Sequence, residues 1–215
     1  MLPRWLIKLG FHLLYNQLAW TYELVAWLVS FGQWSTWRQL ALQFMNPGPT
    51  LELAFGTGVF FIEMLEAGYE PVGIDLSPYM ARQAGRRLHQ NSYAIRLSQA
   101  KTQAIPFPAN HFVNVVGTFP TDYMLDKHTL TELFRVLKDN ANSRLIIVAE
   151  GQLRGPWPIR PFIDWLYKIS NQRTIPPQKP IKLLAAHNFE ARWEIVEYQG
   201  AQARLLIAGK RAKED

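Results

Sequence analysis

A loop with two glycines, Gly56 and Gly58, is the part of the chain whose residue types and spacing best suit chemistry. It lies in residues 51–58, LELAFGTG, between a predicted apolar strand and a predicted helix. Glycine permits backbone conformations closed to other residues and lets a ligand approach the main chain. A helix that begins after such a loop points free N–H groups at the ligand. The segment therefore predicts a site for a ligand that carries a carboxylate or a phosphate at that point.

The glycine spacing separates the candidate ligands. A dinucleotide-binding loop has the pattern G-x-G-x-x-G. Its third glycine would fall on Phe61 when counted from Gly56, and on Val59 when counted from Ala54. A P-loop would need a lysine followed by serine or threonine, and the segment has none. The glycine spacing thus argues against NAD or FAD as the ligand, and the segment does not match a P-loop.

An acidic residue follows at the tip of the next predicted strand. Asp75 lies in residues 72–80, VGIDLSPYM, roughly 20 residues past the loop, which is where a ribose-binding acid is expected. One carboxylate can accept hydrogen bonds from both hydroxyls of a ribose. The loop and the acid together indicate a ligand that contains a ribose.

Predicted strands and helices alternate around these residues. The strands are expected at 50–55, 70–74, 92–97, 112–117, 144–149, 192–198 and 203–208, and the helices at 59–67, 78–89, 129–137 and 181–187. Ser77 and Asp126 are expected to cap two of the helices. The alternation predicts an α/β fold, with a mostly parallel sheet covered by helices on both faces. The last two strands are expected to form a closing antiparallel hairpin.

The N-terminal residues 1–46 are predicted to form a helical cap that ends at Asn46-Pro47-Gly48-Pro49, ahead of one domain at 47–210. Residues 5–37 are rich in tryptophan, leucine and tyrosine, but Lys8, Asn16 and Glu23 interrupt them before a membrane span can form. We expect these helices to pack on the domain. The alternative is that they also touch a membrane surface or a lipophilic substrate. The proline-rich residues 155–180 are predicted to form a lid around a short helix at 162–169.

The composition sets wider limits. The chain has 215 residues, a formal net charge of +6 and no cysteine. The length suits one globular domain with an added helical segment. Without cysteine there are no disulfides and no thiol chemistry, which favours a reducing compartment, so we expect a cytoplasmic protein. The five histidines form no metal-binding pattern, so no metal is expected.

Together, the loop and Asp75 resemble motif I and the acidic motif of class I S-adenosylmethionine methyltransferases. Three further segments are similar to the ubiquinone/menaquinone C-methyltransferase-like group. QAIPFP at 103–108, followed by 112–116, is similar to "LPFP…FD", TELFRVLKD at 131–139 to "ELxRVLKPGG", and NFE at 188–190 to "AGF". The resemblance covers about residues 22–208. It implies a Rossmann-like sheet of seven strands with S-adenosylmethionine bound across the strand tips.

The resemblance also implies the roles of the site residues. Glu52 would anchor the loop and approach the methionine amino group, Asp75 would hold the ribose hydroxyls, and Thr118 would lie beside the methionine end. Leu76 and Met80 would pack against the adenine. The full set of cofactor-binding residues is Glu52, Ala54, Gly56, Thr57, Gly58, Asp75, Leu76, Met80, Thr102, Gln103, Ala104 and Thr118.

Catalytic residues are harder to assign, because methyl transfer mainly requires alignment of donor and acceptor. A base is needed only if the acceptor must lose a proton. Asp122, Tyr123 and Tyr22 are the substrate-side candidates. The segment 118–123, TFPTDY, lacks the (D/N)PP(Y/F/W) motif of methyltransferases that act on amino groups of bases, so no nucleic-acid partner is expected.

The sequence therefore predicts an enzyme that transfers a methyl group from S-adenosylmethionine to a small or lipophilic acceptor. Lys101 and Val113 depart from the family pattern, which has acids at these positions. They motivate the alternative, a catalytically weak or inactive binding module with this fold. In that alternative the N-terminal helices would hold the module at a membrane.

Overall fold

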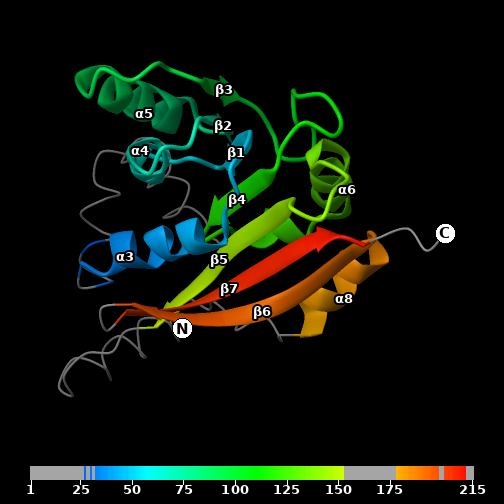
Figure 1. Ribbon diagram of the computed structural model, residues 1–215. Helices are drawn as coiled ribbons and strands as arrows, with labels where there is room; N and C mark the ends of the chain where they lie inside the picture. Colours follow the sequence, from blue (N-terminus) through cyan, green and yellow to red (C-terminus); the bar gives the residue numbers. More distant parts are fainter. Residues whose placement is uncertain (1–26, 28–29, 31, 153–177, 199–200, 212–215) are drawn as a thin grey trace, which may run out of the picture.

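The computed structural model describes residues 27, 30, 32–152, 178–198 and 201–211 (Figure 1). Tyr22, the helix predicted at 162–169 and most of the predicted N-terminal cap lie outside the described residues. Among the described helices, none is both long enough and apolar enough to cross a membrane.

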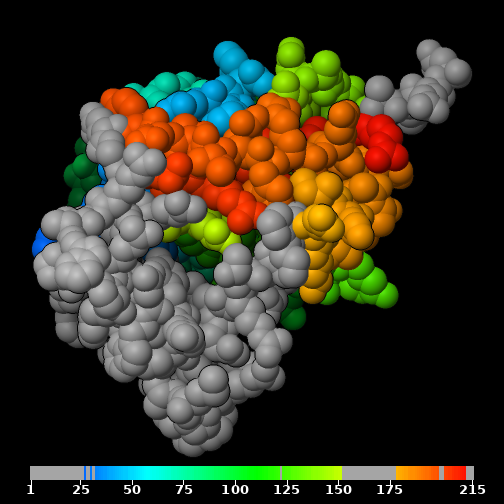
Figure 2. Space-filling model, turned by 90° about the horizontal axis from the view of Figure 1, so that it is seen from below, coloured from blue at the N-terminus to red at the C-terminus, as the bar shows by residue number. Residues whose placement is uncertain are grey.

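One sheet of seven strands runs through the molecule in the order β3-β2-β1-β4-β5-β7-β6. The strands are β1 (Thr50–Leu53), β2 (Pro71–Asp75), β3 (Leu97–Gln99), β4 (Asn114–Thr118), β5 (Arg144–Gln152), β6 (Phe189–Tyr198) and β7 (Ala201–Lys210). The first five in spatial order pair in parallel, whereas β7 lies antiparallel between β5 and β6. The edge strand β6 lies at the surface, with α8 (Gln178–Ala186) beside it (Figure 2). The predicted mostly parallel sheet with a C-terminal antiparallel hairpin is confirmed.

The third strand was predicted at 92–97, which is wrong, because β3 comprises only Leu97–Gln99. Ser92 has a left-handed φ of 60°, and the Tyr93 N–H donates to the Leu88 carbonyl, so the chain is still leaving the preceding helix. Ile95 is exposed rather than buried in the sheet. The β-propensity of Tyr93 and Ile95 was therefore overridden by the turn at the helix end.

The remaining helices are α3 (Trp34–Gln39), α4 (Val59–Glu66), α5 (Pro78–Gln90) and α6 (Lys127–Val136), with 3-10 turns η2 (Leu40–Phe44) and η3 (Asp122–Leu125). The Ser77 hydroxyl accepts from the Met80 N–H at 3.3 Å and caps α5. The Asp126 carboxylate accepts from the His128 N–H at 2.9 Å and caps α6. Both predicted caps are confirmed.

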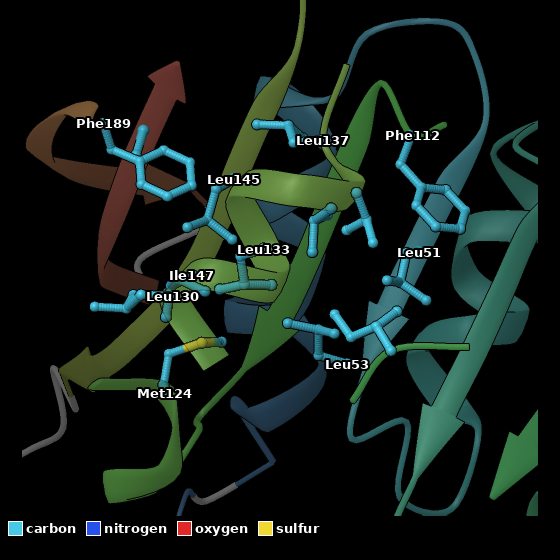
Figure 3. Close-up of a cluster of buried hydrophobic side chains, with 14 of the residues drawn as sticks. Leu51, Leu53, Phe112, Met124, Leu130, Leu133, Leu137, Leu145, Ile147 and Phe189 are labelled. Atoms are coloured by element: carbon cyan, nitrogen blue, oxygen red, sulfur yellow. The ribbon is translucent and has the colours of Figure 1, made fainter. Parts of the chain in front are cut away.

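The two faces of the sheet carry separate hydrophobic cores, because successive strand residues point to opposite sides. In β4, Val115 belongs to a core with α6 and α8, while Val116 belongs to a core with α3, η2 and α4. Figure 3 shows the first core, where Leu130 and Leu133 of α6 lie over the sheet. The prediction of helices on both faces is confirmed.

Trp37 of helix α3 is fully buried in the second core. Trp37 is 0% exposed and contacts β5 at Gly151. A Cβ atom added to Gly151 would overlap the indole ring. The described part of the predicted N-terminal cap therefore packs on the sheet, and its position depends on a strand far along the chain.

We predict that Gly151→Ala lowers the free energy of unfolding by about 1–3 kcal/mol, because the added methyl overpacks against Trp37. Denaturant titration measures this. The control is Gly209→Ala in β7, where an added Cβ atom would lie 3.5 Å from its nearest neighbour, the Ser143 carbonyl oxygen. That variant should change by less than about 0.5 kcal/mol. Equal losses of stability in both variants would contradict the close contact between Gly151 and Trp37.

Candidate cofactor site

The loop between β1 and α4 contains three residues with left-handed backbone conformations. The φ angles are 51° at Ala54, 55° at Gly56 and 77° at Gly58, which forms the N-cap of α4. A Cβ atom on Gly58 would lie 2.8 Å from the Ala84 Cβ atom, so this glycine lets α4 approach α5. A Cβ atom on Gly56 would meet only the Ala54 carbonyl oxygen, at 4.0 Å. Gly56 thus leaves its main chain open to a ligand, as a cofactor loop requires.

The Asp75 carboxylate joins this loop to the end of β2. The Gly56 N–H donates to Asp75 Oδ2 at 2.9 Å, and the Ser77 N–H donates to Oδ1 at 2.7 Å. Burial raises the pKa of Asp75, while the backbone hydrogen bonds from Ser77, Gly56 and Leu76 oppose that rise. Each oxygen retains further acceptor capacity. The loop and the acid, predicted separately from the sequence, therefore lie in direct contact.

Glu52 lies one residue before the end of β1, with neighbours in both β2 and β4. It is 1% exposed, and its Oε2 atom has no hydrogen-bond partner in the structure described here. Burial raises the pKa of Glu52 well above its usual value, the nearby Arg38 guanidinium lowers it, and Glu63 and Asp75 raise it further. A buried carboxylate oxygen without a partner is costly in free energy. A ligand ammonium group would supply the missing donor, so Glu52 fits the methionine end of the cofactor.

The residues predicted around the adenine differ in exposure. Met80 is buried, whereas Leu76, next to Asp75, is 60% exposed and offers an apolar surface. The hydroxyls of Thr102 and Thr129 share a hydrogen bond of 3.1 Å, so Thr102 is tied to α6. Gln103 and Ala104 lie exposed beside it. The ligand contacts of these residues stay predictions.

Two residues that the sequence analysis left without a role hold this segment in place. The Arg135 guanidinium of α6 donates to the carbonyls of Phe107 at 2.7 Å and Ile105 at 2.8 Å. The Glu132 carboxylate accepts from the Ile105 N–H at 2.7 Å and pairs with Arg135. In the sequence, the i,i+3 spacing of Glu132 and Arg135 on one helix indicates that they can form an ion pair. The sequence alone does not show that such a pair binds a distant loop.

Val113 has a packing function. A Cβ atom on Gly48 would lie 2.6 Å from a methyl carbon of Val113, so the valine closes over the chain that enters β1. The next residue, Asn114, donates to the Asn46 carbonyl at 2.7 Å and accepts from the Asn46 N–H at 2.9 Å. This departure from the family pattern is therefore accommodated in the core.

The segment after β4 contains the predicted substrate-side residues. Tyr123 in η3 is half-buried against the first core. Asp122 lies in the same turn, but its side chain is outside the described part, as is all of Tyr22. The structure thus tests no catalytic role for any of them. The described residues contain no cluster of acids and histidines that could hold a metal ion.

Sequence analysis missed Phe119, which follows Thr118 at the end of β4. It has a φ of 49°, which is rare for a bulky residue and is often found at functional sites. Its ring lies 4.0 Å from that of Trp34 in α3 and 6.2 Å from that of Trp37, centroid to centroid. The half-buried rings of Phe119 and Trp34 thus give an apolar surface next to Thr118, and the fully buried Trp37 packs against both.

Comparisons with known proteins agree with this fold and loop. The family model described as "Methyltransferase domain" matches residues 50–140. The demethylmenaquinone methyltransferase of Thermus thermophilus is 31% identical over 76% of this chain and 74% of its own. The ubiquinone/menaquinone biosynthesis C-methyltransferase of Syntrophotalea carbinolica is 31% identical over 76% of this chain and 68% of its own.

Solved structures support the fold. A methyltransferase from Thermotoga maritima superimposes with a TM-score of 0.65 and 17% identity, covering 94% of this chain and 99% of that one. The geranyl diphosphate C-methyltransferase of Streptomyces coelicolor superimposes with a TM-score of 0.63 and 14% identity, covering 83% of this chain and 79% of that one.

The fold of this chain is therefore shared with solved S-adenosylmethionine-dependent methyltransferases. With a relative 31% identical over about three quarters of both chains, the chain belongs to the S-adenosylmethionine-dependent methyltransferase family. The predicted family, enzyme class and cofactor are confirmed. Membership of this family favours an active methyltransferase over the alternative of an inactive binding module.

We predict that Ala54→Gly raises the free energy of unfolding by up to about 1 kcal/mol, because glycine adopts the left-handed conformation of this position without strain. Thermal and chemical denaturation measure the change. The control is Ala81→Gly within α5, where glycine should lower the free energy of unfolding by about 1 kcal/mol. A loss of stability in both variants would show that Ala54 is not strained.

Proposed function

We propose that this methyltransferase acts on a small, lipophilic acceptor of quinone type. The observation that carries the proposal is the 31% identity to a demethylmenaquinone methyltransferase over about three quarters of both chains. The half-buried rings of Phe119 and Trp34 support it, because flat aromatic rings stack well on such side chains.

In this proposal the cofactor lies over the carboxyl ends of β1 and β2. Asp75 accepts hydrogen bonds from the ribose hydroxyls, and Glu52 receives the ammonium group. Gly56 lets the main chain come close, while Leu76 packs on the adenine. The remaining contacts come from Ala54, Thr57, Gly58, Met80, Thr102, Gln103, Ala104 and Thr118.

The cofactor supplies an electrophilic methyl group on a sulfonium. The protein then has to hold the acceptor carbon in line with that methyl group and keep water away. Phe119 and Trp34 would orient the acceptor ring. Asp122, Tyr123 and Tyr22 are the candidates to take up the proton that the acceptor carbon loses.

Methyl transfer to a short-chain demethylated naphthoquinol, assayed with methyl-labelled cofactor, tests the acceptor class. We expect labelled product from the wild type. Asp75→Asn should bind S-adenosylmethionine roughly 10- to 100-fold more weakly, since it loses a charge-assisted hydrogen bond. Calorimetry gives the dissociation constants.

The matched control for that assay is Asp126→Asn, because asparagine also caps helices and Asp126 serves α6. Its cofactor affinity should equal that of the wild type. Tight cofactor binding without transfer to the quinol would reject the acceptor class and leave the enzyme class intact. Unchanged affinity in Asp75→Asn would reject the ribose contact.

We further propose that the enzyme is cytoplasmic and contacts membrane surfaces through residues 5–37. At the membrane it would bind a lipid-like acceptor. Tryptophan and tyrosine favour that interface. The full chain should float with phosphatidylglycerol vesicles, and replacing Trp5 and Trp20 by serine should reduce the bound fraction severalfold. Tyr198→Ser, which removes an exposed aromatic ring on β6, is the control. Equal flotation of all three proteins would contradict the proposal.

A further inference from the structure

A short turn lies just before the main chain that α6 holds. The Ala104 N–H donates to the Lys101 carbonyl at 3.0 Å and closes residues 101–104 into this turn. The turn begins with a lysine, where the family pattern has an acid. The N–H groups of Thr102 and Gln103 find no acceptor in the part of the chain that the structure describes. The turn therefore has free main-chain donors where a carboxylate is missing.

Main-chain donors of this kind can distinguish one purine base from another. Adenine has an acceptor nitrogen, N1, beside its amino group. Hypoxanthine has a hydrogen on N1 and an oxygen in place of the amino group. A main-chain N–H that donates to N1 of adenine meets the N1 hydrogen of hypoxanthine and is left unpaired, so the site rejects hypoxanthine. This selectivity requires that the turn is held in a fixed position.

Helix α6 holds the residue that follows the turn. The Arg135 guanidinium donates to the Ile105 carbonyl at 2.8 Å and to the Phe107 carbonyl at 2.7 Å. The Glu132 carboxylate accepts from the Ile105 N–H at 2.7 Å. Hydrogen bonds from Arg135 outweigh burial and lower the pKa of Glu132, so the pair remains charged. Both main-chain polar groups of Ile105 are therefore bound by one ion pair.

A further contact connects α6 with the turn itself. The hydroxyl oxygens of Thr102 and Thr129 lie 3.1 Å apart, and Thr129 is fully buried. Thr129, Glu132 and Arg135 follow one another at intervals of three residues, which places them on one side of the helix. The same side of α6 thus binds the turn and the residues that leave it.

We propose that Glu132 and Arg135 are positioning residues for base selectivity: by holding the main chain at 105–107, they keep the 101–104 turn where its N–H groups distinguish adenine from other purines. The proposal rests on the placement of adenine beside this turn in the proposed function. It also explains how the site accommodates Lys101, because selectivity then comes from main-chain donors instead of an acid.

The test compares S-adenosylhomocysteine with S-inosylhomocysteine, which differ only at N1 and C6 of the base, by calorimetry of the full chain. The wild type should bind the adenosyl ligand roughly 100-fold more tightly. In Arg135→Met this preference should fall below about 10-fold, because 105–107 loses two charge-assisted hydrogen bonds. Arg135→Lys should have an intermediate preference, since an ammonium group lacks the planar fork of donors.

Two control variants separate positioning from general stability. Arg192→Met on β6 removes an ion pair of the same length, 2.7 Å to Glu194, and should keep the wild-type preference. Leu133→Val disturbs the core packing of α6 without removing a hydrogen bond to 105–107 (Figure 3). It should weaken the binding of both ligands by the same factor.

Equal weakening of both ligands in Arg135→Met, in parallel with Leu133→Val, would overturn the proposal, because a purely structural role predicts that result. A wild type that binds both ligands equally well would overturn it too. If Arg135→Met does not fold, the preference of Arg135→Lys decides, and a wild-type value there also overturns the proposal. Absence of binding of either ligand to the wild type at millimolar concentration would instead reject the proposed function.

Discussion

The contact between Asp75 and the glycine loop is the interaction on which the site depends. One carboxylate accepts the Gly56 N–H and the Ser77 N–H, and so joins the ends of two neighbouring parallel strands. Parallel strands bring their carboxyl ends to the same edge, but they do not fix the loops beyond them. Here Asp75, the residue predicted to hold the ribose, also fixes the glycine loop after β1.

Much of the fold could be predicted from local patterns in the sequence. Apolar runs and the capping residues Ser77 and Asp126 located most strands and helices within a few residues. The third strand failed because Tyr93 and Ile95 have strand propensity, while a turn at Ser92 sets the local backbone. Propensity describes a residue by itself, and the end of a helix can outweigh it.

The candidate site was predictable in its two signature pieces and much less so elsewhere. Gly56 and Asp75 could be predicted from their spacing along the sequence, and in the structure they are in contact. Phe119, Glu132 and Arg135 lie far from these residues in sequence and act through contacts between elements. Such contacts depend on which helix packs on which strand. Local patterns in a single sequence do not predict that packing.

The contact between Gly151 and Trp37 also has a consequence for folding during protein synthesis. The helix that carries Trp37 leaves the ribosome early, while the strand that receives it is completed more than one hundred residues later. A nascent chain that has completed the glycine loop and Asp75 therefore still lacks the strand against which Trp37 packs. The packing of helix α3 is thus completed only after β5 has been synthesised.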